Sequence, residues 1–196
     1  MQHIRADAHK KDVTTPSDAE LLRRSHLDPT VFGDLFDRHG AAVHRYLARR
    51  VGSENADDLL SEVFARAIEA RMRARPHESG SALPWLYGIA RNVVRTHLRT
   101  RDRPVGMSQD ASIDWDAVDA RLDAVAMAST LRKALATLSA IESEILLLVS
   151  WEQLSISEAA EALDISSTAA RSRLHRARAR AAAALAAMPS QPQETP

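Results

Sequence analysis

Apolar residues recur at intervals of three and four along most of this chain, and no segment alternates apolar and polar residues as a half-buried β-strand does. Val43, Leu47 and Val51 are a clear instance. The pattern predicts an all-α protein. With 196 residues, of which 45% are hydrophobic and only 4% aromatic, the chain can form one medium domain or two small helical ones. Breaks in the pattern favour two.

The main break lies at residues 104–128, which contain Pro104, Gly106 and few large apolar side chains and therefore predict a linker. Residues 1–16 and 189–196 are polar and unpatterned, which is typical of disordered tails. We accordingly predict one helical domain at residues 17–103 and a second at residues 129–188.

Charge is distributed unevenly, although the formal net charge is zero. Residues 91–103 carry five Arg and one Asp, residues 104–128 carry five Asp and one Arg, and residues 171–180 carry five Arg and no acid. The linker is thus acidic and lies between two basic blocks. Each basic block is dense enough to support contacts with nucleic acid.

Turn and capping residues predict where the helices of the first domain begin and end. Gly52 separates two helices, and Asn55 or Asp57 is expected to cap the second of them. A loop is expected at residues 75–82, after which Pro84 suits the first turn of another helix. The polar side of that helix carries an arginine every fourth residue, which places these side chains on one stripe: Arg91, Arg95 and Arg99.

Two capping boxes predict helix starts in the second domain, Ser139 with Glu142 and Ser155 with Glu158. In each box the Ser and Glu side chains satisfy free backbone N–H groups at the helix start. The helix after the first box is apolar nearly all round and is expected to form the core of the domain.

The second box opens a short helix at residues 158–163, which is followed by a turn at 164–166 and a long basic helix from about 167 to 188. A short helix, a turn and a basic helix form a helix-turn-helix, here expected in a winged-helix-like domain that binds DNA. An isolated Arg-rich helix would more simply be a solvated helix, but the capped helix and turn before it favour DNA binding. The inward face is expected to hold Ala170, Leu174 and Ala177.

Three stretches, in this order along the chain, resemble one family. ADDLLSEVFARAI (56–68), PWLYGIARNVVRTHLR (84–99) and LSISEAAEALDISSTAARSRLHRARAR (154–180) are similar to the polymerase-docking, promoter-melting and promoter-reading segments of extracytoplasmic-function (ECF) sigma factors. The resemblance covers residues 18–103 and 129–186. It implies a sigma factor that binds core RNA polymerase, directs it to promoter DNA and helps to melt that DNA, with sigma region 2 at 17–103 and region 4 at 129–188.

The resemblance also implies roles for individual residues. Polymerase docking falls to Asp58, Leu59, Glu62 and Val63, beside a Ser61 that stands where the family often has Gln. Recognition and melting of the minus-ten element fall to the loop at 75–82 and to Tyr87, Arg91, Asn92, Arg95 and Arg99. Recognition of the minus-thirty-five element falls to Arg171, Ser172, His175 and Arg176 at base edges, and to Arg173 and Arg178 nearer phosphate. The family resemblance further implies an anti-sigma factor as a partner.

Two alternatives stay open. A helix-turn-helix regulator that acts without polymerase would bind DNA through the second domain in the same way, but it has no need of docking and melting segments. The acidic linker either imitates nucleic acid in a basic polymerase channel or is a solubilising spacer.

Other features exclude whole classes of function. The chain has no cysteine, its eight histidines lack metal-ligand spacing, and it has no Gly-rich phosphate loop, so we expect no catalysis, no cofactor and no metal. The amino-terminal segment lacks the apolar core of a signal peptide, and no run approaches the roughly 18 apolar residues of a membrane span. We therefore expect a cytoplasmic protein without membrane insertion.

Overall fold

The computed structural model describes residues 15–101 and 133–187, and within these two ranges it contains helices and loops but no strand. This confirms the all-α prediction. The predicted linker at 104–128 and most of the two predicted tails lie outside the described residues. No helix in the described part of the chain is long and apolar enough to cross a membrane.

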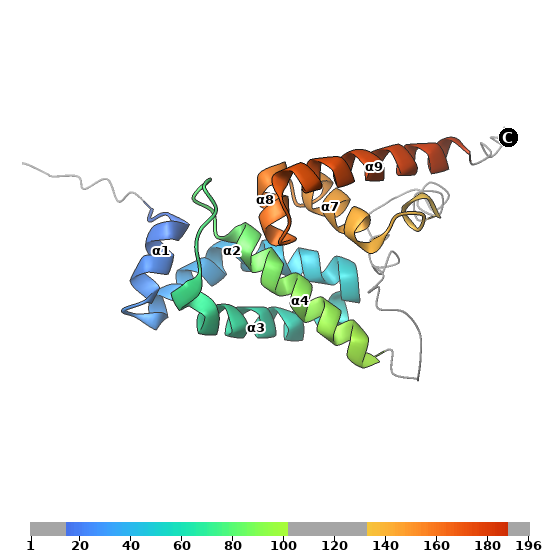
Figure 1. Cartoon of the computed structure of the whole chain (residues 1–196). Helices are drawn as coiled ribbons and strands as arrows, with labels where there is room; N and C mark the ends of the chain where they lie inside the picture. Colours follow the sequence, from blue (N-terminus) through green and yellow to red (C-terminus); the bar gives the residue numbers. More distant parts are fainter. Residues whose placement is uncertain (1–14, 102–132, 188–196) are drawn as a thin grey trace, which may run out of the picture.

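The first domain is built from α1 (Asp18–Ser25), α2 (Phe32–Val51), α3 (Ser53–Ala70) and α4 (Leu83–Arg101), with short 3-10 turns at Pro29–Val31 and Arg71–Arg73. Figure 1 shows α2, α3 and α4 crossing one another, with α1 at one end. Their shared interior is filled by large side chains that are almost completely buried, among them Leu35, Val43, Tyr46, Leu47, Val63 and Leu86.

Gly52 separates α2 from α3, as predicted, because its φ of 80° lies in the left-handed region that other residues rarely adopt. The predicted cap of α3 was wrong. The helix begins at Ser53, directly after Gly52, and no side chain caps it. Asn55 instead donates its side-chain N–H to the carbonyl of Val51 at 2.8 Å, so it closes the end of the preceding helix.

A buried carboxylate, Asp18, joins three elements of this domain. It accepts hydrogen bonds from His39 Nε2 of α2 at 2.6 Å and from the backbone N–H of Ala82, just before α4, at 2.8 Å. Arg38 pairs with its other oxygen. Burial alone would raise the pKa of Asp18, but the hydrogen bonds from His39 and Ala82, the charge of His39 and the hydrogen bond from Arg38 lower it to about 2.

Replacing Asp18 with Asn is expected to lower the free energy of unfolding by about 2 kcal/mol at pH 7, because the ionised carboxylate is what the folded state stabilises. Its pKa is depressed on folding, so its contribution is complete above about pH 4 and is lost as the pH falls toward 2. Urea unfolding of both proteins between pH 7 and pH 2 measures this. The exposed Asp37→Asn variant serves as a control. A stability gap that stays constant over this pH range would contradict the assignment.

The second domain contains α7 (Ala140–Ser150), α8 (Ile156–Ala162) and α9 (Ser167–Ala186). Both predicted capping boxes are present, at Ser139 with Glu142 and at Ser155 with Glu158. The turn between α8 and α9 includes Asp164 with a φ of 54°, and α9 begins after a Ser166 side chain that accepts the N–H of Ala169. The predicted inward face is confirmed, since the buried residues of α9 are Ala170, Leu174, Ala177 and Ala181.

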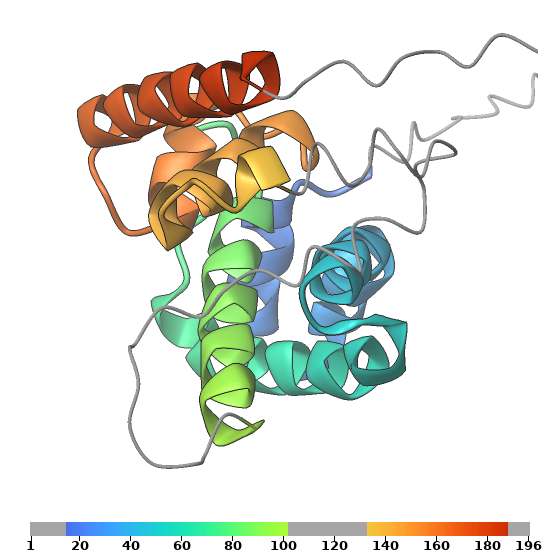
Figure 2. The ribbon, with the colours of Figure 1, turned by 90° about the vertical axis from the view of Figure 1, so that its right-hand side faces the viewer.

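The two domains are in contact, which the sequence did not predict. Figures 1 and 2 show α7, α8 and α9 on one side of the first domain, over α2 and α4, and α3 on the opposite side. Helix α8 packs on α4, and the buried apolar side chains of both domains form one continuous core. Gly88 of α4 is the point of close approach, because a Cβ at this position would lie 3.4 Å from the carbonyl oxygen of Ala162.

Candidate nucleic-acid and polymerase interfaces

Helix α9 presents a basic face to solvent along the outer side of the second domain (Figure 1). The Ser166 cap fixes where the helix begins. Its alanine and leucine face packs on α7 and α8, so the opposite face is exposed to solvent. Most of the residues predicted to contact the minus-thirty-five element are exposed on it: Arg171, Ser172, His175, Arg176 and Arg178. Arg173 is half-buried, and its Nη1 atom is buried without a hydrogen-bond partner among the described residues.

Glu142 connects α9 to the start of α7. Its carboxylate lies 3.7 Å from Arg176 Nε and 2.7 Å from Arg180 Nη1, while it also closes the capping box with Ser139. Burial acts to raise the pKa of Glu142, but the Ser139 hydrogen bonds and the charges of the two arginines lower it overall. Arg176 is still 54% exposed. It is therefore positioned by Glu142 and remains accessible to DNA.

Helix α4 carries a second basic stripe. Asn92, Arg95 and Arg99 are exposed and Arg91 is half-buried, so the predicted polar face exists. Tyr87 differs from its predicted role. It is 1% exposed, and its hydroxyl donates a hydrogen bond to Glu152 Oε2 at 2.9 Å, so in this conformation it cannot stack on a base. Its burial raises its pKa, as does the neighbouring carboxylate of Glu152.

The loop before α4 turns at Gly80, whose φ is 82° and whose N–H donates to the carbonyl of His77 at 2.7 Å. This turn agrees with the predicted loop at 75–82. Ser79 at its tip donates a hydrogen bond to Glu158 Oε1 of α8 at 2.8 Å. The candidate melting loop is therefore attached to the first helix of the helix-turn-helix.

Two of the four residues predicted to dock polymerase are in the wrong place for that role. Leu59 and Val63 lie in the core, with exposures of 5% and 0%, because they share the face of α3 that packs on α2 and α4. Asp58 is exposed, and Glu62 is partly exposed and pairs with Arg66 at 2.5 Å. The docking role stays a prediction for the two acidic residues, which solvent can reach, and is corrected for the two apolar ones.

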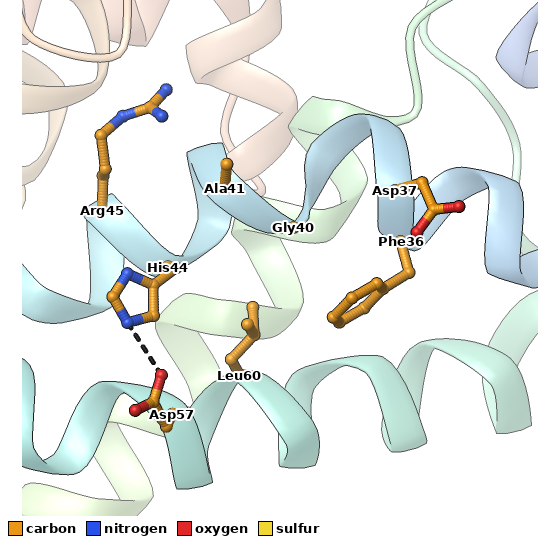
Figure 3. Close-up of a pocket in the computed structure, with 8 residues that line it drawn as sticks. All are labelled: Phe36, Asp37, Gly40, Ala41, His44, Arg45, Asp57 and Leu60. Atoms are coloured by element: carbon orange, nitrogen blue, oxygen red, sulfur yellow. Dashed lines mark ion pairs between the residues drawn. The ribbon is translucent and has the colours of Figure 1, made fainter.

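A groove beside these acids runs between α2 and α3 and has a volume of about 540 Å³ (Figure 3). Phe36, which is 43% exposed, and the half-buried Leu60 point into it, and Phe64 packs against Phe36 with ring centroids 4.8 Å apart. His44 Nε2 lies 3.1 Å from Asp57 Oδ1 and links the two helices at one end. The accessible apolar contact on this face is therefore Phe36 with Leu60, in place of Leu59 and Val63.

Comparison with known proteins identifies the family to which this chain belongs. Residues 35–104 match the model of Sigma-70 region 2, and residues 129–180 match that of Sigma-70 region 4. RNA polymerase sigma factor NccH of Alcaligenes xylosoxydans xylosoxydans is 32% identical over 189 residues, which cover 88% of this chain and 97% of NccH. The chain belongs to the ECF sigma factors.

Further relatives agree. ECF sigma factor SigC of Mycobacterium tuberculosis is 36% identical over 142 residues, which cover 69% of this chain and 73% of SigC. Other matches are partial: the chain spans 38% of BldN of Streptomyces coelicolor at 31% identity, 38% of CarQ of Myxococcus xanthus and 32% of RfaY of Xanthomonas campestris. The structure of CnrH in complex with the cytosolic domain of CnrY has the same fold, with a TM-score of 0.61 and 24% identity over 89% of this chain and 100% of CnrH.

In this sigma factor, the sequence prediction missed a polar cluster between regions 2 and 4. Arg50 of α2 is 1% exposed, its Nη2 lies 2.7 Å from Glu144 Oε2 of α7, and its guanidinium lies 3.6 Å from the centre of the Tyr46 ring. Burial acts to lower the pKa of Arg50, but the charge of Glu144 raises it overall.

A second ion pair lies beside the first. Arg49 of α2 pairs with Glu152, just beyond α7, and the same carboxylate accepts the hydroxyl of Tyr87. Two acidic residues of region 4 thus insert among arginines and tyrosines of region 2. One signal in the sequence could have indicated this: Arg50 follows Val43 and Leu47 at the spacing of the buried face, where a charged residue needs a partner.

Proposed function

We propose that this chain is a transcription initiation factor that binds core RNA polymerase, directs it to promoters with minus-ten and minus-thirty-five elements, and helps to separate the strands. Region 4 recognises the upstream element through α9, and region 2 holds the downstream element through α4 and the loop before it. The factor catalyses no reaction itself and acts on cytoplasmic polymerase.

The observation that carries this proposal is that one chain of the family holds two separate arginine faces, on α4 and on α9, together with an acidic face on α3. Arginine suits DNA because its planar fork pairs with guanine in the major groove or with phosphate along the backbone. An acidic face with an apolar groove repels DNA and fits a basic protein surface. A regulator that acts without polymerase has no use for this third face.

A protein inhibitor is a further proposed partner. RpoE of Bartonella quintana, whose structure has a TM-score of 0.56 with this chain, was solved in complex with the anti-sigma factor NepR. We propose that an anti-sigma factor likewise holds this chain and covers its polymerase and DNA faces.

Adding the purified chain to core polymerase from its own organism, with genomic DNA as template, is expected to produce new discrete transcription start sites that share an upstream motif. Sequencing the 5′ ends of the transcripts measures this. Core polymerase alone is the first control, and a variant with Arg91, Arg95 and Arg99 changed to Ala is the second, which should lose most of the new starts. DNA binding by the chain without any polymerase-dependent start site would support the regulator instead.

A further inference from the structure

Helix α1 contacts both ends of the segment that leads from α3 to α4 (Figure 1). At the amino end of α1, Asp18 accepts the backbone N–H of Ala82, the last residue before α4, at 2.8 Å. At its carboxyl end, His26 Nε2 donates to the carbonyl of Arg71 at 3.0 Å, and Arg71 Nε donates to the carbonyl of Ser25 at 3.0 Å. The candidate melting loop lies between these two sets of contacts.

The contacts with α1 are the main polar attachment of this segment to region 2. Within the described residues, the other hydrogen bonds of positions 71–82 join neighbours in the segment or reach the adjacent turns of α3 and α4, except for one from Ser79 to Glu158 of region 4. The apolar residues of the segment that pack on the core are small, namely Ala74 and Ala82. The placement of the loop therefore depends on α1.

The amino-end contact is itself fixed by α2 and by the core. His39 Nε2 donates to the Asp18 carboxylate at 2.6 Å, and Arg38 pairs with its other oxygen. Leu21 and Leu22 hold α1 in the core, with exposures of 0% and 2%. A carboxylate beside the first N–H groups of α4 is favourable, because a helix carries partial positive charge at its amino end. Asp18 thus places the first turn of α4 as well as the end of the loop.

The exposed side of α1 gives little reason for a DNA contact of its own. Arg23 and Arg24 are exposed, but both pair with Glu20, at 2.7 and 2.6 Å. Attraction to phosphate needs positive charge that is not already compensated. We therefore expect α1 to act on promoter DNA only through the loop that it holds.

We propose that α1 is a positioning helix for promoter opening, which presents the melting loop and the first turn of α4 to the minus-ten element. Its eight residues make a helix about 12 Å long, and this length sets how far apart the two ends of the loop lie. A loop that is already in place loses less freedom when it binds an unpaired base, so opening is faster. Asp18, His26 and Arg71 are positioning residues and do not touch DNA. Their role in opening rests on the proposed function, whereas the placement of the loop does not.

Two variants release α1 from the loop at opposite ends. Asp18→Ala removes the acceptor of the Ala82 N–H, and His26→Ala with Arg71→Ala removes the contacts at the other end. Asp18→Asn keeps an oxygen for the Ala82 N–H and should restore part of the contact. Arg23→Ala is the matched control, because it changes an exposed residue of the same helix that has no contact with the loop.

Hydrogen exchange in the free protein measures the placement of the loop. Each release variant should speed exchange in peptides that cover residues 74–82 about tenfold or more, because a lost hydrogen bond makes local opening more frequent. Exchange in α3 should keep the parent rate, Arg23→Ala should match the parent throughout, and Asp18→Asn should fall between the parent and Asp18→Ala.

Unchanged loop exchange in both release variants would overturn the positioning role. Faster exchange throughout α3 as well would assign these contacts to the stability of region 2 as a whole, against the proposal. Circular dichroism checks that each variant is folded, and if Asp18→Ala is not, the variant with His26→Ala and Arg71→Ala decides.

Promoter opening tests the consequence for transcription. On a duplex promoter chosen from the start sites that the parent produces, both release variants should slow opening about tenfold, as followed by 2-aminopurine fluorescence in the minus-ten element. A template with that element already unpaired should bring transcription back to within about twofold of the parent. A factor that is only less stable would be impaired on both templates, which would contradict the proposal.

Two further outcomes separate this inference from the proposed function. Faster loop exchange with normal opening of the duplex promoter would overturn the role of α1 in opening. A parent that protects its loop in the free state and opens no promoter with polymerase would overturn the proposed function and leave the placement of the loop by α1 intact.

Discussion

Arg176→Ala is expected to weaken binding to the minus-thirty-five element about 10- to 100-fold, or about 1–3 kcal/mol, and to relax the sequence preference, because an arginine at a base edge discriminates between bases. Arg180→Ala is the matched control. Both arginines pair with Glu142 and are similarly exposed, at 54% and 55%. Loss of either exposed ion pair should change stability by only a few tenths of a kcal/mol. Each variant loses one ion pair with Glu142, so a difference in DNA binding between the two variants does not come from Glu142.

Binding of each variant to a library of upstream elements measures the difference between these two arginines. Arg178→Ala is expected to weaken binding to all sequences alike, as a phosphate contact does. If Arg176→Ala keeps the preference of the parent, base reading belongs to other residues of α9, and Arg176 serves mainly to join α9 to Glu142.

Leu59→Ala is expected to lower the free energy of unfolding by about 2–5 kcal/mol, because it leaves a cavity in the core of region 2. Replacing a surface residue that contacts polymerase should instead leave stability nearly unchanged and weaken polymerase binding. Asp58→Ala, one position away and exposed, should leave stability within about 0.5 kcal/mol and weaken binding to core polymerase.

Thermal unfolding and polymerase affinity, measured on both variants, distinguish a residue that packs in the core from one that contacts polymerase. Leu59→Ala with unaltered unfolding and weak polymerase binding would restore the role that the sequence resemblance gave to this residue. Asp58→Ala with full polymerase affinity would place the docking contact elsewhere, and the groove lined by Phe36 and Leu60 would be the next surface to change.

Features that depend on neighbours in the chain were predicted well. The two capping boxes and the inward face of α9 follow from spacings of three and four residues, and the structure has them where they were expected. The cap of α3 was missed because the φ of Gly52 lets the chain start a new helix at once, so Asn55 and Asp57 fall inside it. Local patterns do not reveal how abruptly one helix follows another.

Features that depend on distant parts of the chain were predicted poorly. Leu59 and Val63 were assigned to docking because a resemblance aligns positions without showing which face of α3 is buried. The buried Tyr87 and Arg50 bind acidic residues of the other domain, which lie 65 and 94 positions away in the sequence. Periodicity within one helix cannot identify such partners, although an arginine at a core position indicates that one exists.

The close approach at Gly88 ties a cost in one domain to the packing of the other. A glycine in the middle of a helix lowers its stability relative to alanine by roughly 1 kcal/mol, so Gly88 is unfavourable for α4 alone. A Cβ at this position would already be in van der Waals contact with the carbonyl oxygen of Ala162, so a large helix-forming side chain such as leucine would improve the helix and press against the backbone of α8. We therefore expect residues 88 and 162 to covary among sigma factors of this length, and a bulky residue at position 88 to mark relatives that do not pack their domains in this way.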